Sequence, residues 1–514
     1  MLRFQVFHDG QAAPSLDLDT LYLLGADNVP VRSEFTFAPG ELSCRKRPAG
    51  PCALALMWPV NDFGAVLLET VRLPERPEPY VLNVELARGR MMRLLQKREE
   101  WGLLDISAAQ KISDKFNEGR DLLIAAIENL DDPAAASRLA DRCLAATLPL
   151  SEQTAVLHAE LLLQRRINTR SIPKNVFGCW AELQQTGEPY RRKVLGSGDF
   201  VCLPMPWKLI EPQQQTRDFT LLDDWINLLL RAKIPVVAGP LVQFHETVLP
   251  GWLYIWENDY ETVRGLLYEH IERLLTHFGG QVALWNVLSG LHANAHFVFT
   301  YDQLMDLTRM AVTLVKKKQP TIRTMIEITQ PWGEYYAANS RSIPPLVYAE
   351  MAVQSGVPFD VFGLQLCFGA PHDGCWQRDL FQISAMLDHF APFGKPVIIT
   401  RLAVPNTPPE NGRGGVWHKP WSDSLQARWL ETVTNIALSK PFVEAVCWSD
   451  LVDRPGAGIP AAGLLGADLN PKAAFQTWQA MRRAVATVHQ NSSRTGGHAK
   501  PGAGATAEAG NRPQ

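Results

Sequence analysis

The chain has 514 residues, of which 46% are hydrophobic and 20% charged, and this composition excludes a chain that is disordered throughout. Its 50 basic and 53 acidic residues give a formal net charge of -3, without the basic excess typical of proteins that bind nucleic acid or membrane surfaces. We therefore expect a small-molecule, carbohydrate or protein partner, and neither nucleic acid nor a membrane.

The N-terminal stretch carries acidic residues early and has no apolar run long enough for a signal peptide. No later stretch reaches about 18 uninterrupted apolar residues, so the pattern predicts a cytoplasmic protein. The eight cysteines lack CxxC spacing, and we expect most of them to be buried apolar side chains. Because no nucleotide-binding or HExxH motif is present, we expect neither a cofactor nor a metal.

Residues 1–88 are predicted to form a small antiparallel β domain. Apolar and polar residues alternate there, turn signals such as Asp9-Gly10 and Pro48-Ala-Gly50 separate the runs, and the last strand is expected at 80–86.

A helical connector is expected over residues 89–172, because the apolar period changes to about 3.6 residues. Ser151 is expected to open one of its helices. The apolar residues predicted to share one side of another helix are Leu122, Ile124, Ala125, Ile127 and Leu130.

Residues 173–487 are predicted to form a (β/α)8 barrel, because eight short β-rich runs alternate with helix-length segments. The runs cover 176–180, 200–203, 234–239, 282–288, 321–328, 359–366, 396–402 and 442–448. A doubly wound open sheet is the alternative, but no GxGxxG or GxxxxGK[ST] motif follows any run. The Gly-, Ala- and Pro-rich residues 488–514 are expected to be a disordered tail.

The active site of such a barrel lies at the C-terminal ends of the strands. The residues expected at those ends are Trp180, Glu182, Trp207, Glu211, Gln243, His245, Glu246, Asn286, Ser289, His292, Glu327, Trp332, Glu334, Gln365, Cys367, Arg401, Trp448, Asp450 and Asp453. Tryptophan is frequent among them, and its broad apolar face suits the C–H face of a sugar ring. The set favours a carbohydrate site, with core packing of each tryptophan as the alternative.

Six segments carry a family resemblance. They are Trp207-Lys-Leu-Ile-Glu-Pro212, Gly239-Pro-Leu-Val-Gln-Phe-His245 with Pro250-Gly-Trp252, Leu266 to Leu288, Gly363-Leu-Gln365, Ile399-Thr-Arg-Leu402, and Leu464 to Lys472. In this order they resemble motifs of glycoside hydrolase family 10, the xylanase family, over about residues 175 to 485. The resemblance implies a barrel that acts on xylan or related oligosaccharides.

The same resemblance implies two catalytic glutamates about 5 Å apart, one as acid/base and one as nucleophile. It places the acid/base at Gly290 and the nucleophile at Arg401. Register error does not explain the loss, because no Glu lies between Arg273 and Asp302 and no acidic residue between Pro392 and Asn406. A cation at position 401 also opposes the positive charge of an oxocarbenium-like transition state, which disfavours hydrolysis by the family mechanism.

We therefore expect a carbohydrate-binding or regulatory protein with a degenerate family 10-like barrel and without standard retaining hydrolysis. One alternative is an active glycoside hydrolase that uses the relocated carboxylates Glu327, Glu334 and Asp450. In that region an ion pair between Glu327 and Arg401 is the structural alternative to catalysis. The other alternative is a non-catalytic interaction scaffold, because a fold does not fix a function.

The expected partner is an oligosaccharide or polysaccharide. Since Arg401 could hold a carboxylate with two parallel hydrogen bonds, an anionic sugar such as a uronate is a specific hypothesis. The residues predicted to bind the sugar are Trp207, Gln243, His245, Asn286, His292, Trp332, Gln365, Arg401 and Trp448.

Overall fold

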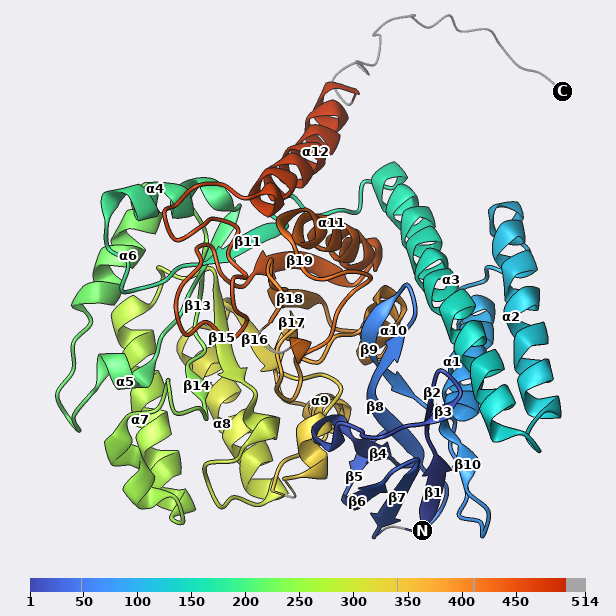
Figure 1. Cartoon of the computed structure of the whole chain (residues 1–514). Helices are drawn as coiled ribbons and strands as arrows, with labels where there is room; N and C mark the ends of the chain where they lie inside the picture. The colour runs from blue at the N-terminus through green and yellow to red at the C-terminus, as the bar shows by residue number, and fades with distance from the viewer. Residues whose placement is uncertain (48, 340, 410–411, 496–514) are drawn as a thin grey trace, which may run out of the picture.

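The computed structural model describes residues 1–495 except 48, 340 and 410–411, and its largest part is a closed parallel β-barrel surrounded by helices (Figure 1). The barrel strands are β11 (Phe177–Trp180), β12 (Phe200–Leu203), β13 (Val236–Ala238), β14 (Val242–Gln243), β15 (Leu284–Ser289), β16 (Arg323–Ile328), β17 (Val361–Cys367), β18 (Val397–Ala403) and β19 (Val443–Trp448). The sheet closes where β13 pairs with β15. The eight predicted β runs and the (β/α)8 class are confirmed, and closure excludes the open sheet.

Alternating side chains divide each barrel strand between two cores. In β12, Phe200 and Cys202 join the apolar cluster inside the barrel, while Val201 and Leu203 pack against the surrounding helices. These helices are α4 (Glu188–Ser197), α5 (Trp207–Ile210), α6 (Thr220–Arg231), α7 (Tyr260–Phe278), α8 (Tyr301–Lys318), α9 (Pro345–Gln354), α10 (Leu380–Asp388), α11 (Asp423–Ser439) and α12 (Ala473–Thr495). Among the described residues, no helix is both long and apolar enough to cross a membrane.

The first part of the chain forms small β-sheets, as predicted. Their strands are β1 (Leu2–Gln5), β2 (Phe7–His8), β3 (Gln11–Ala12), β4 (Tyr22–Leu24), β5 (Pro30–Val31), β6 (Ser33–Ala38), β7 (Glu41–Lys46), β8 (Ala53–Val60), β9 (Gly64–Glu69) and β10 (Tyr80–Val81). Pairing is antiparallel apart from β10, which runs parallel to β1. The prediction of a strand over 80–86 is wrong beyond Val81, where a helix begins. Residues 82–87 are buried on every side of this helix, so the spacing of apolar residues there does not show the helical period.

Three helices form the connector: α1 (Leu82–Glu100), α2 (Gln110–Glu128) and α3 (Pro133–Asn168). Ser151 does not open a helix, because α3 is continuous from its Asp132 cap and the Ser151 hydroxyl bonds the Thr147 carbonyl at 2.7 Å. The predicted apolar side of α2 is also wrong. Ile124 is 46% exposed, whereas α2 buries Ala126 toward its neighbours.

The C-terminal helix corrects the expected start of the tail. Residues 488–495 belong to α12, and the rest of the predicted tail, 496–514, lies outside the described residues.

Candidate functional site

The barrel mouth, meaning the C-terminal ends of the barrel strands, holds residues 290 and 401, the two positions where the family resemblance places a catalytic glutamate. Ser289 ends β15, and Gly290 follows with a left-handed φ of 60°. Arg401 lies in β18 opposite Gln365 of β17, and Glu327 of β16 lies opposite Ser289. Neighbouring strands therefore bring these five residues to one end of the barrel.

Arg401 of β18 lies over the ring of Trp180, which comes from β11, two strands away in the sheet order. Its guanidinium carbon is 4.0 Å from the ring centre, and its Nη1 donates to the Ser449 hydroxyl at 3.2 Å. The Trp180 indole donates to the Thr400 carbonyl at 2.6 Å and is only 6% exposed. The indole and the guanidinium therefore stack against each other at the ends of β11 and β18.

A second polar group consists of Asn286, Ser289 and Glu327, each only 1% exposed. Asn286 Nδ2 donates to Glu327 Oε2 at 3.2 Å, while the other oxygens of both side chains and the Ser289 hydroxyl have no partner among the described residues. Among the described residues, Glu327 and Arg401 do not form an ion pair. The Glu327 carboxylate accepts a hydrogen bond from Asn286, and the Arg401 guanidinium donates one to Ser449. Buried polar atoms without partners are costly, but residues that are 1% exposed are covered by their neighbours, so this group lies beneath the surface of the mouth.

The other two candidate carboxylates are held by arginine. Glu334 pairs with Arg378 at 2.5 Å and accepts a hydrogen bond from the Gly374 amide. Burial raises the pKa of Glu334, and the Arg378 charge opposes that rise. Asp450 pairs with Arg454 at 3.2 Å. Both carboxylates are less than a tenth exposed, so neither faces open solvent.

His292 is a buried structural histidine beside the mouth. Its Nδ1 lies 2.6 Å from the Tyr335 hydroxyl, which donates to the Ile343 carbonyl, and its Nε2 accepts the Thr329 amide at 3.2 Å. These bonds fit the neutral imidazole with the proton on Nδ1. Burial lowers the pKa of His292 to about 3, which agrees with the same form.

His245 lies in the loop after β14, is exposed, and places its Nδ1 2.8 Å from the Thr247 hydroxyl. Its ring centre is 6.4 Å from that of His296. Within the described part of the chain, no group of three or more His, Cys, Asp or Glu side chains could hold a metal ion.

The three tryptophans predicted to bind sugar pack against protein groups. Trp207 stacks on His270 with ring centres 4.2 Å apart, Trp332 lies 4.6 Å from the Arg378 guanidinium, and the fully buried Trp448 donates to a carbonyl. Gln243 and Gln365 remain partly exposed at the mouth. Trp180 is among the residues expected at the strand ends, but no signal in the sequence showed that its ring lies under the Arg401 guanidinium.

A closed parallel barrel with a polar, aromatic mouth defines the architecture that many enzymes share. The model of glycosyl hydrolase family 10 matches residues 203–481, more than half of the chain, and the chain belongs to this family. Endo-1,4-beta-xylanase B of Thermotoga neapolitana is 23% identical over 285 residues, covering 53% of this chain and 76% of the relative.

Solved structures of xylanases also match part of the chain. Native xylanase 10B from Thermotoga maritima matches with a TM-score of 0.47 and 18% identity, over 63% of this chain and 99% of that chain. Xylanase 10B from Thermotoga petrophila in complex with xylobiose matches with a TM-score of 0.46 and 19% identity, over 62% and 97% of the two chains.

Proposed function

We propose that the barrel mouth binds a carbohydrate of the β-1,4-xylan class and does not cleave it by the retaining mechanism. The observation that carries this proposal is Arg401, a cation at the nucleophile position that lies 4.0 Å from the Trp180 ring centre. Relatives of the chain are named xylanases, which supports the choice of sugar. At a few ångströms and an effective dielectric near 20, replacing a carboxylate by a cation disfavours an oxocarbenium-like transition state by several kcal/mol.

An active enzyme with relocated carboxylates has less support. Retaining or inverting cleavage needs two carboxyl groups that can reach the scissile bond, about 5 to 9.5 Å apart. Glu334 and Asp450 are engaged by Arg378 and Arg454, which leaves Glu327 without a second free carboxylate among the three candidates. A pure interaction scaffold is supported by the packing of Trp207, Trp332 and Trp448 against protein groups. The partly exposed side chains of Arg401, Gln243 and Gln365 at the strand ends favour ligand binding over that scaffold.

The ligand is an anionic xylan fragment, such as one that carries a uronic acid. Arg401 is partly exposed, its described side-chain hydrogen bond goes to the neutral Ser449 hydroxyl, and a guanidinium binds a carboxylate with two parallel hydrogen bonds. The partly exposed side chains of Gln243 and Gln365 would bind sugar hydroxyls beside it.

Isothermal titration calorimetry with a neutral xylo-oligosaccharide and its glucuronic acid-bearing counterpart tests this function. We expect the acidic ligand to bind at least about tenfold more tightly, which corresponds to about 1.4 kcal/mol. Arg401→Gln should remove the preference. Arg323→Gln is the matched control, because Arg323 begins β16 at the opposite end of the barrel and pairs with Glu444.

Different outcomes of this titration would contradict different parts of the proposal. Equal binding of both ligands removes the anionic preference, and absence of binding removes the carbohydrate function. Release of the aryl group from aryl-xylosides by the wild-type protein, lost in Glu327→Gln, would establish the relocated-carboxylate alternative instead.

A further inference from the structure

The loops after three consecutive strands of the barrel are held against the N-terminal sheets. After β17, the Gln377 carbonyl accepts the amide of Leu67 in β9 at 2.9 Å. After β18, the Val416 amide donates to the Ala65 carbonyl, also in β9, at 2.8 Å. After β16, the short helix η5 (Glu334–Ala337) packs against β4 and β5. We call these three loops the sealed half of the mouth.

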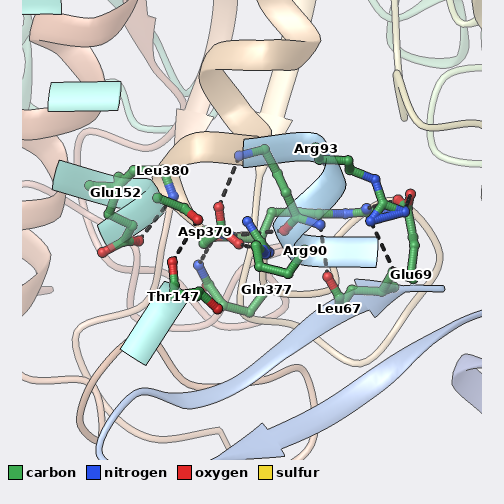
Figure 2. A network of polar contacts seen from close by, with 12 residues as sticks. Leu67, Glu69, Arg90, Arg93, Thr147, Glu152, Gln377, Asp379 and Leu380 are labelled. Carbon is green, nitrogen blue, oxygen red and sulfur yellow. Dashed lines mark hydrogen bonds and ion pairs between the residues drawn. The ribbon is translucent and has the colours of Figure 1, made fainter. Parts of the chain in front are cut away.

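Buried charges fix the sealed half to the connector as well as to the sheets. Figure 2 shows Arg90 of α1 reaching Asp379, Arg93 reaching Glu69 of β9, and Glu152 of α3 accepting the Leu380 amide. Arg90 and Asp379 are almost fully buried, so separating them would leave an uncompensated charge. These buried contacts hold the three loops of the sealed half in place as a fixed wall, so the loops do not open readily.

The loop after β19 covers the same side of the mouth, and we call this loop the roof. Ile459 and Ala462 pack with Ala370 and Ala403 in one buried cluster, against which Cys367 also packs. Cys367 ends β17 two residues beyond Gln365, which lies opposite Arg401. The wall and roof therefore reach the immediate surroundings of Arg401.

The loops after β14 and β15 have a different character, and we call them the open half. His245 is exposed there with its ring centre 6.4 Å from that of His296, and the His296 ring centre is 5.9 Å from that of Tyr254. Ile255 is 72% exposed and Val298 is 46% exposed. Exposed aromatic and apolar side chains near polar groups suit the faces of sugar rings.

We propose that this mouth takes one end of a sugar chain, which lies over the open half and ends at Arg401. The inference rests on the proposed carbohydrate function. A chain that continued past Arg401 would meet the wall built by β9 and the loops after β17 and β18, so its interior cannot occupy the site. Short oligosaccharides and chain ends are therefore the ligands, even where the longer polymer is available.

Binding stoichiometry tests the inference. Xylotriose, xylohexaose and a soluble glucuronoxylan of known mean length would each be titrated into the full-length protein by calorimetry, with analytical ultracentrifugation of the xylan mixture. End recognition gives one protein per sugar chain for all three ligands, with similar affinity for xylotriose and xylohexaose. Several proteins on each xylan chain would overturn end recognition while leaving the proposed function intact, whereas no binding to any ligand would overturn both.

Paired variants test the direction of approach. His245→Ala with His296→Ala should weaken xylohexaose binding about three- to tenfold, the size of one or two ring contacts. Arg413→Ala is the control on the sealed half, where Arg413 pairs with Asp17 and Asp19 at the surface, and it should bind like the wild type. All three positions tolerate truncation because two are exposed and His296 is partly exposed. An equal loss in the control would contradict approach over the open half.

Discussion

At the scale of single residues, the backbone at Gly290 matters as much as the missing carboxylate. Gly290 has a φ of 60°, and a Cβ at this position would lie 2.8 Å from the Thr329 hydroxyl oxygen. A left-handed conformation costs a residue with a side chain about 1–2 kcal/mol. Placing a glutamate at position 290 therefore does not by itself rebuild an acid/base site.

We predict that Gly290→Ala lowers the free energy of unfolding by about 1–2 kcal/mol or more, measured by urea denaturation. Gly356→Ala is the matched control, because Gly356 has a similar φ of 68° with no atom within 4 Å of the added Cβ. The free energy of unfolding of the control should fall only by the cost of the left-handed backbone conformation. A loss at Gly290 no larger than at Gly356 would show that Thr329 yields without cost.

We predict that His292 makes the fold less stable in mild acid. The pKa of buried His292 is about 3, below the unfolded value of about 6.5, so the unfolded chain binds more protons between these values. The contribution is complete above about pH 6.5 and is lost as the pH falls toward 3. Between pH 7.5 and 5 it amounts to about 2 kcal/mol.

Urea denaturation at pH 7.5 and pH 5 measures this effect. In His292→Gln the loss of stability between the two pH values should be smaller by about 2 kcal/mol. His245→Gln, which changes an exposed histidine, should leave the loss as in the wild type. The same pH dependence in all three proteins would show that His292 does not titrate as described.

At the scale of elements, the edge strand β9 joins the N-terminal sheets to the barrel. An unpaired edge strand offers free amide and carbonyl groups, and here the loops after β17 and β18 supply partners for Leu67 and Ala65. Arg378 lies at this junction and contacts Glu334, Glu69 and the Tyr22 hydroxyl. One buried guanidinium thus connects three elements.

We predict that Arg378→Met lowers the free energy of unfolding by about 3–5 kcal/mol, because Glu334 then remains buried without its cation. Arg413→Met is the control, since its ion pairs with Asp17 and Asp19 are at the surface and it should leave stability almost unchanged. Chemical denaturation followed by tryptophan fluorescence compares the two variants. Similar losses in both would argue that burial does not govern this junction.

At the scale of the whole molecule, α3 links the two main cores. Leu144 and Leu148 belong to the core under the N-terminal sheets, while Ala159 belongs to the barrel core. Near its end, Arg166 donates to the carbonyls of Leu438 and Lys440 at 2.7 Å each. A continuous helix that shares both cores couples the parts of the chain.

We predict that residues 1–495 unfold in one cooperative transition, because the junction is buried and charged and α3 is common to both cores. Differential scanning calorimetry should give a single endotherm, and Arg166→Met should move it to lower temperature without splitting it. Two resolved endotherms in the wild type would contradict coupling between the N-terminal part and the barrel.

The sequence by itself determined the barrel, and it has Gly290 and Arg401 at the two positions where the family resemblance places a catalytic glutamate. The eight apolar runs are local signals, because each strand buries both faces, and residues 290 and 401 follow from short motifs within these runs. The spacing of apolar residues did not predict the start of α1, because that helix is buried on all sides there. It also did not predict that α3 is one continuous helix, because Pro149 lies inside it.

Only the tertiary structure decided what surrounds Arg401. The Trp180 indole reaches the Thr400 carbonyl across 220 positions of the sequence, and Arg378 reaches Glu334 and the Tyr22 hydroxyl from a distant loop. Such contacts depend on how strand ends and loops meet in space, which residue type and spacing do not encode locally. The stacking of Arg401 on Trp180, the sealed half and the open half of the mouth are consequences of that packing.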